Sequence, residues 1–101
     1  MRHDLKCWMG PFEEVIRDRK HHEIRVDDRP EGYTIHDELL LCEWRPATRV
    51  EGPEGGERAW PGEYTGRRQL VAVTSISRGP DWGLPVGLVV MSIERRSMRE
   101  L

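Results

Sequence analysis

The alternation of apolar and polar residues predicts a small protein built mainly of strands, with one helix near its beginning. Residues 4–9 alternate and predict a first strand, which ends at Gly10 and Pro11. Phe12, Val15 and Ile16 follow at helical spacing. With proline in the first turn, this spacing predicts a short helix over residues 11–18.

The most charged stretch of the chain, residues 19–29, comes directly after this helix. Seven of its eleven residues carry formal charge. Glu23, Arg25 and Asp27 nevertheless alternate with Ile24 and Val26, which predicts a strand with one apolar face. Residues 28–32 have turn chemistry and close this strand. A charged strand face in so small a protein is where we look for a functional site.

Three more strands are predicted. Residues 38–45 are predicted to be buried on both faces at their start, with Glu43 projecting from the row of Leu39 and Leu41. Residues 63–67 predict a turn into a long strand, 68–77, in which Ile76 shares a row with Leu70. Residues 86–93 predict the last strand, and the tail to residue 101 predicts at most one helical turn. The Gly- and Pro-rich segments 46–62 and 78–85 predict loops.

Five or six short strands with one early helix predict an α+β fold, a small β-barrel, since a curled sheet leaves no long bare edge. We expect one domain over residues 1–101, with Trp8 and Phe12 in its core. The two cysteines, Cys7 and Cys42, lie in apolar segments and are expected to be reduced.

The composition narrows the class of partner. The net charge is -2 and the pI is near 6.1, so the chain lacks the excess of Lys and Arg that a long nucleic-acid backbone requires. The longest apolar run has four residues and no secretory segment is recognised, so we expect a cytoplasmic monomer that does not enter a membrane. A nucleic-acid role would therefore depend on a local pocket.

Several motifs occur together in a fixed order: His3 to Trp8, Phe12, Arg19-Lys20-x-x-Glu23-Ile24-Arg25-x-x-Asp28-Arg29, Leu39-x-Leu41-x-Glu43-Trp44, Glu63 to Arg67, and Gly83 to Ile93. This order resembles an uncharacterised bacterial and phage family, DUF3850-like, that is related to the ASCH domains of the PUA-like superfamily of small β-barrels. The resemblance spans residues 3–93.

The resemblance implies a cleft between the helix and the barrel that binds RNA or a nucleotide. One branch of small ASCH proteins removes acyl groups from N4-acylcytidine with a lysine, a threonine three residues later and a glutamate from elsewhere. The lysine corresponds to Lys20 and the threonine position holds Glu23. Glu43 is our candidate for the glutamate.

Three interpretations of these charged residues stay open. In the first, Lys20, Glu23 and Glu43 form the catalytic site of an amidohydrolase, in which a carboxylate activates water and a cation stabilises the oxyanion. In the second, the site binds RNA or a modified base without catalysis. In the third, the charges form a structural ion-pair network. The residues expected to bind the ligand are Lys6, Arg25, Arg29, Trp44 and Trp82, with Trp60 as a further stacking candidate.

We expect no cofactor and no metal site. His21 and His22 are adjacent, so on a strand they point to opposite faces and cannot bind one ion together. His3 and His36 are distant in sequence. The sequence thus predicts a pocket that uses side-chain charges and aromatic rings alone.

Overall fold

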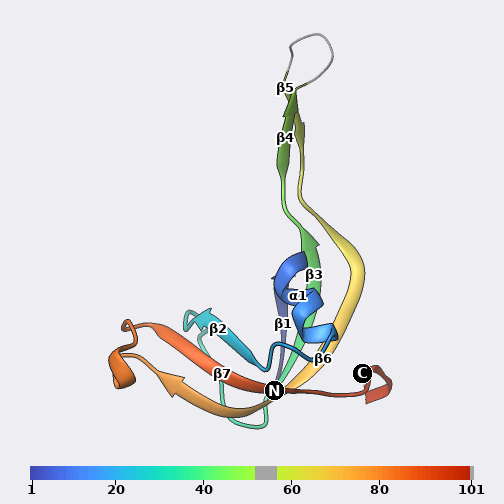
Figure 1. Ribbon diagram of the computed structural model, residues 1–101. Helices are drawn as coiled ribbons and strands as arrows, with labels where there is room; N and C mark the ends of the chain where they lie inside the picture. Colours follow the sequence, from blue (N-terminus) through green and yellow to red (C-terminus); the bar gives the residue numbers. More distant parts are fainter. Residues whose placement is uncertain (52–56, 101) are drawn as a thin grey trace.

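The computed structural model of the chain describes residues 1–51 and 57–100, and the side chains of residues 1–48 and 61–99. Its main part is one curled sheet of five strands with one short helix against it (Figure 1). The strands lie in the order β1-β3-β6-β7-β2. Their bounds are Arg2–Trp8 for β1, His22–Val26 for β2, Glu38–Arg45 for β3, Glu63–Arg78 for β6 and Leu88–Arg95 for β7.

The curled sheet forms half of a barrel. Its two edge strands, β1 and β2, are the first two strands of the chain. β1 pairs with β3 in parallel, and the other neighbouring strands pair antiparallel. Among the described residues no ladder joins β1 to β2. The predicted α+β fold of five to six strands is therefore confirmed in its coarse form, a small mixed sheet that curls without closing between β1 and β2.

The concave face of the sheet holds the core. Its largest fully buried side chains include Tyr33, Phe12, Leu39, Leu41 and Met91. Leu40 is also buried, on the other face of β3, which confirms the prediction that both faces of this strand are covered at its start. The predicted core position of Phe12 is confirmed, but that of Trp8 is wrong, since this indole is 61 % exposed at the end of β1.

The helix α1 (Met9–Ile16) follows β1 without a linker. Phe12 and Val15 are buried against the sheet. The helix ends at Ile16, and Asp18, just beyond the capping residue Arg17, has a φ of 60° in the left-handed region that commonly terminates helices. The backbone N–H of Lys20 then donates to the carbonyl of Glu14, so the chain folds back and enters β2 beside the helix.

β2 has the predicted position, and its charged row, not its apolar row, faces the concave side of the sheet. The apolar side chains of Ile24 and Val26 are 53 % and 62 % exposed, whereas Glu23 is buried. Pairing with β7 places Glu23 opposite Met91 and Arg25 opposite Val89, two residues of the concave face. Because side chains alternate along a strand, this register turns the apolar row outward.

The predicted turn at residues 63–67 is wrong, since these residues belong to β6. The predicted row joining Ile76 to Leu70 is also wrong. A bulge occurs where Val73 pairs with Ile93 and Ser75 pairs with Ser92. The extra residue shifts the alternation, so Ile76 packs against the concave core instead.

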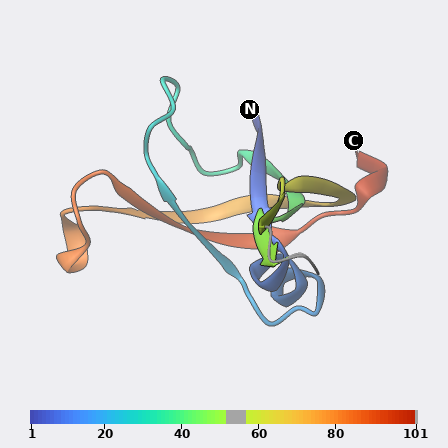
Figure 2. The ribbon, with the colours of Figure 1, turned by 90° about the horizontal axis from the view of Figure 1, so that it is seen from above.

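The segment 46–62, predicted to be a loop, contains a two-stranded ribbon. β4 (Thr48–Glu51) pairs antiparallel with β5 (Glu57–Trp60) and extends away from the sheet above β3 and β6 (Figure 1). Residues 52–56 lie outside the described residues. Seen from above, the ribbon lies near β1 and α1, whereas the β6–β7 hairpin extends to the left, away from them (Figure 2).

Two short 3-10 turns complete the described chain: η1 (Asp81–Gly83) in the β6–β7 connection and η2 (Met98–Glu100) after β7, where one helical turn was predicted. Cys7 and Cys42 are both free thiols. Within residues 1–51 and 57–100, no helix is long and apolar enough to cross a membrane.

Candidate functional site

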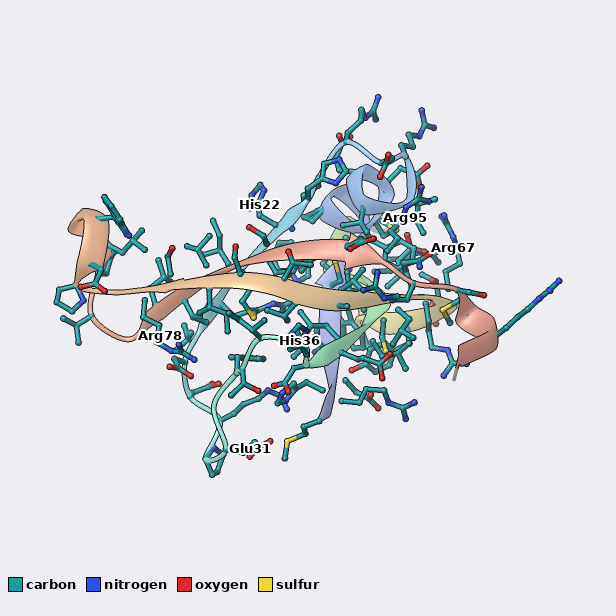
Figure 3. All side chains as sticks on the ribbon, turned by 90° about the horizontal axis from the view of Figure 1, so that it is seen from below. His22, Glu31, His36, Arg67, Arg78 and Arg95 are labelled. Carbon is teal, nitrogen blue, oxygen red and sulfur yellow. The ribbon has the colours of Figure 1, made fainter. Side chains whose placement is uncertain are left out.

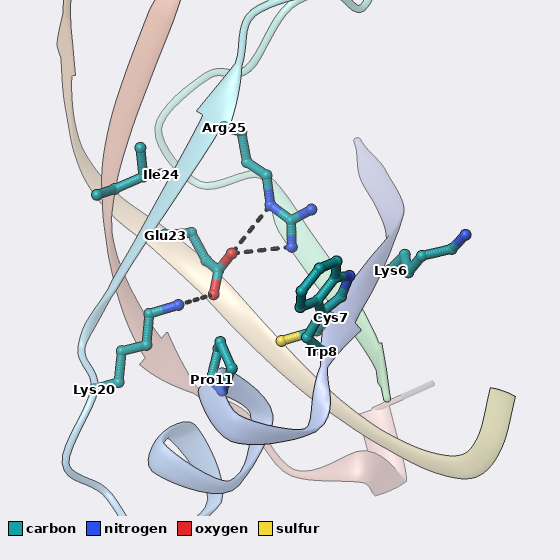
Figure 4. A pocket seen from close by; sticks show the side chains of 8 residues that line it. All are labelled: Lys6, Cys7, Trp8, Pro11, Lys20, Glu23, Ile24 and Arg25. Carbon is teal, nitrogen blue, oxygen red and sulfur yellow. Dashed lines mark hydrogen bonds and ion pairs between the residues drawn. The ribbon is translucent and has the colours of Figure 1, made fainter. Parts of the chain in front are cut away.

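Two adjoining cavities lie between β1 and β2, the edges at which the half-barrel is open. The first, called here the Glu23 cavity, has a volume of about 330 Å³. From β1 and the start of α1 it is lined by Lys6, Cys7, Trp8 and Pro11. From the facing side it is lined by Lys20, Glu23, Ile24 and Arg25 (Figure 4).

The second cavity, called here the Arg29 cavity, has a volume of about 470 Å³. It shares Lys6, Ile24 and Arg25 with the first, so the two form a continuous groove along β2. α1 closes the groove at one end. Arg29 and Tyr33, from the connection between β2 and β3, line the other end.

A buried carboxylate between two cations forms the wall of the Glu23 cavity. The Nζ of Lys20 donates to Oε1 of Glu23 at 2.8 Å. The Nε and Nη2 of Arg25 lie 3.1 and 3.0 Å from Oε2 (Figure 4). The Glu23 side chain is only 3 % exposed. A buried carboxylate needs compensating charge, and here each oxygen has its own cationic partner.

The local fold explains why these three groups meet. Glu23 and Arg25 are two residues apart on β2, so both project to the concave side. Lys20 is anchored by its backbone at the end of α1 and reaches the carboxylate from the opposite direction. Sequence analysis predicted that Lys20, Glu23 and Arg25 share one cleft, and the structure places all three on it.

This arrangement offers mostly hydrogen-bond donors. An ammonium has three N–H groups and a guanidinium has five, and the contacts with Glu23 use only some of them. Oε1 of Glu23 retains a lone pair after its contact with Lys20, whereas Oε2 already has two contacts with Arg25. The wall can therefore donate to several acceptors of a ligand while accepting a single hydrogen bond from it.

Cys7 lies beneath this cluster and remains protonated. Its sulfur points to the same side as Glu23 (Figure 4). Burial, and then the negative charge of Glu23, raise the pKa of the Cys7 thiol to about 11, against the lowering effect of Lys20 and Arg25. A thiol with this pKa is not a thiolate nucleophile at neutral pH.

The match to a protein family covers nearly the whole of this structure. A family model described as a domain of unknown function, DUF3850, matches residues 2–93. The chain belongs to the DUF3850 family. This confirms the DUF3850-like part of the predicted resemblance, and both walls of the groove lie inside the matched segment. No curated protein matches the chain.

Two other predicted ligand-binding residues of this DUF3850 domain, Arg29 and Lys6, line the groove but do not contact Glu23. Arg29 belongs to the second cavity, where its Nε donates to the hydroxyl of Tyr33 at 3.1 Å. Lys6 lines both cavities, yet its side chain points away from Glu23 (Figure 4). The Lys6 ammonium lies 3.8 Å from the centroid of the Trp44 ring, a cation–π contact.

Glu43 has partners of its own. The hydroxyl of Thr65 donates to its Oε1 at 2.6 Å, and Arg67 lies 3.5 Å from its Oε2. Glu43 lines a separate cavity of about 290 Å³ with residues of β6. The structure therefore places Glu43 in a different cluster from Lys20 and Glu23.

The predicted stacking residues are also outside the two cavities of the groove. Trp44 packs edge-to-face against Tyr64, with ring centroids 4.8 Å apart. A Cβ on Gly62 would lie 2.4 Å from this indole, which explains the glycine. Trp82 is 88 % exposed in η1, in the β6–β7 connection. The side chain of Trp60 lies outside the described part.

Sequence reasoning missed Trp8, Cys7 and Tyr33 as lining residues of the DUF3850 groove. The sequence pattern indicated only one of them, because the alternation in β1 predicts that Cys7 points inward. Nothing in the sequence placed β1 and β2 on facing edges, and that topology brings Trp8 beside Glu23. Around the described His, Cys, Asp and Glu side chains, no group of three could hold a metal ion.

Proposed function

We propose that the chain is a ligand-binding protein whose Glu23 cavity accepts a nucleoside with a modified pyrimidine base. The observation that carries this proposal is the buried Glu23 carboxylate, fixed by Lys20 and Arg25 at the wall of a cavity of about 330 Å³. That volume is within the range of about 300–1,000 Å³ found for small-molecule sites. Donors next to an acceptor suit the edge of cytosine, where acceptors stand beside the N4 amino group.

The position of Trp8 supports a ring-shaped ligand. Its exposed indole lines the same cavity as Glu23 and offers a flat apolar surface on which a base can stack. Stacking and edge recognition together are how proteins hold unpaired bases. The resemblance of residues 3–93 to ASCH domains of the PUA-like superfamily supports the same class of ligand.

A second candidate function is hydrolysis of an amide bound in this cavity, such as N4-acetylcytidine. The observation in its favour is the contact of 2.8 Å between Lys20 and Glu23, which puts a base and an electrophilic cation side by side. Glu23 would take a proton from water, whose oxygen attacks the acyl carbon, with Arg25 stabilising the oxyanion. The C–N4 bond then breaks, the proton moves to N4, and the products are cytidine and acetic acid.

Water is the nucleophile in this candidate for two reasons. The chain has Glu23 where the ASCH amidohydrolases have threonine. The thiol of Cys7, which lines the cavity, has a pKa raised by burial to about 11. Catalysis therefore depends on a Glu23 oxygen that still has room for water beside its cationic partner.

Ligand-observed NMR and chromatography with N4-acetylcytidine test both functions in one sample. Binding by the wild type that is lost in Glu23→Gln but kept in Glu94→Gln, an exposed glutamate of β7, supports the pocket. Release of acetate that stops in Lys20→Ala supports hydrolysis. Binding without turnover on a panel of acylated cytidines rejects the hydrolase, and absence of both binding and turnover rejects the nucleoside pocket itself.

A further inference from the structure

The Arg29 cavity contains a cation, Arg29, that has no carboxylate partner among the side chains the structure describes. Arg29 is half-buried, and its Nε and Nη2 donate to the Tyr33 hydroxyl and to the backbone carbonyl of Asp4, at 3.1 and 3.2 Å. Both acceptors are uncharged. Among the described side chains, those of residues 1–48 and 61–99, no carboxylate lies within ion-pair distance of Arg29, whereas Arg25 is compensated by Glu23.

These contacts fix the guanidinium while leaving donors available. Two of its five N–H groups are used by Tyr33 and Asp4. A planar guanidinium held in place loses little conformational freedom when it binds an anion, and its paired donors match the oxygens of a phosphate. The exposed carboxylate of Asp28 lines the same cavity and opposes an anion there.

We propose that the natural ligand of the groove is a nucleotide, with its phosphate on Arg29 in the Arg29 cavity. This inference rests on the proposed nucleoside pocket and adds the phosphate to it. Arg25 lines both cavities, so a ligand whose base meets Glu23 has its sugar-linked phosphate directed along β2 toward Arg29. A free nucleotide and a single nucleotide of an RNA chain present the same group.

The test compares four ligands by NMR titration: N4-acetylcytidine, its 5′-monophosphate, ribose 5-phosphate, and a trinucleotide RNA with the modified base in its centre. We expect the 5′-monophosphate to bind about tenfold more tightly than the nucleoside, as one charge-assisted hydrogen bond predicts. The trinucleotide separates the two sources of phosphate, since tighter binding than the monophosphate identifies RNA and weaker binding identifies the free nucleotide.

Three variants locate the effect. Arg29→Gln should remove the advantage of the phosphate, while Arg99→Gln, which removes an exposed arginine after β7, should keep it and serves as the charge-matched control. Asp28→Asn should strengthen binding of the monophosphate only. Because Asp28 is exposed, this variant still tests the site if loss of the Arg29 contacts unfolds the chain.

Each result separates this inference from the proposed function. Equal affinities for nucleoside and monophosphate overturn the phosphate site and leave the nucleoside pocket intact. Ribose 5-phosphate binding as tightly as the nucleotide overturns the nucleotide assignment, since the base then contributes nothing. If neither nucleoside nor nucleotide binds, both proposals are wrong.

Discussion

Glu23 and Asp37 are both buried carboxylates, but their surroundings differ. Glu23 is held by the ends of two long cationic side chains at the wall of a cavity. Asp37 is held by donors from two parts of the chain: the ring Nε2 of His3 on β1 at 2.8 Å, and the backbone N–H and hydroxyl of the nearby Thr34 at 3.0 and 2.9 Å. The Asp37 backbone also pairs with Val73 of β6.

The position of Asp37 agrees with a structural role. It is the last residue of the connection between β2 and β3. Figure 3 shows two other residues of this connection, Glu31 and His36, on the opposite side of the sheet from α1. The contacts of Asp37 tie that connection to β1 through His3 and to β6 through Val73. Neither cavity of the groove is lined by Asp37. Burial of a carboxylate is therefore no sign of a ligand site without an adjoining cavity.

The largest expected difference between the two carboxylates is in stability. Asp37→Asn should lower the free energy of unfolding by about 3 kcal/mol, since several charge-assisted hydrogen bonds are lost inside the fold. Glu23→Gln should cost only about 1 kcal/mol, because Lys20 and Arg25 can turn toward water. Urea denaturation of both variants measures this, and an equal loss in both would contradict the division into structural and ligand-binding carboxylates.

The next largest effect is the dependence of stability on pH. Burial alone would raise the pKa of Asp37, but the hydrogen bonds from His3 and Thr34 outweigh it and hold this pKa well below its usual range. An unfolded aspartate has a pKa of about 3.9. The stability contributed by Asp37 is therefore complete above pH of about 4 to 5 and declines as the pH falls below it.

The control for this acid loss is the Asp37→Asn variant itself. Denaturation curves between pH 6 and pH of about 3 should show a steeper decline for the wild type than for Asp37→Asn. Parallel declines would mean that other carboxylates cause the loss of stability at low pH. Asp37 would then not stabilise the attachment of the connection to β1.

The fold could be predicted where burial dominates the local pattern. The leucines of β3 gave its bounds correctly, Glu38–Arg45, because a strand covered on both faces needs an unbroken apolar run. The ribbon of β4 and β5 could not be predicted from its Gly and Pro residues. Pro46, Pro61 and Gly62 lie at the break between the two ladders, so the breakers interrupt the pairing without abolishing it.

The cluster around Glu23 was predictable because its residues are neighbours in sequence. Lys20, Glu23 and Arg25 lie within one short segment, and local geometry alone brings them together. Glu43, Trp44 and Trp82 were assigned across elements whose pairing was unknown, and the structure places them elsewhere. The inward turn of Glu23 depends on the register of β2 with β7, which a pattern within β2 does not contain.

The smallest expected effect is on the chemical reactivity of Cys7. In a Cys42→Ser background, iodoacetamide should modify Cys7 slowly at pH 8, because burial and the charge of Glu23 raise the pKa of this thiol to about 11. Glu23→Gln removes the negative charge and leaves Lys20 and Arg25 uncompensated, so the pKa of Cys7 should fall. One unit of pKa corresponds to about tenfold more thiolate, and thus to faster alkylation.

Glu43→Gln provides the matched control for this measurement. The charge of Glu43 also raises the pKa of Cys7, but less than burial and the charge of Glu23 do. Its removal should therefore accelerate alkylation less than that of Glu23. Rates measured across pH separate a lower pKa from a looser structure, because loosening raises the rate at every pH without moving the midpoint. An unmoved midpoint in Glu23→Gln would show that Glu23 does not set the electrostatics of the cavity.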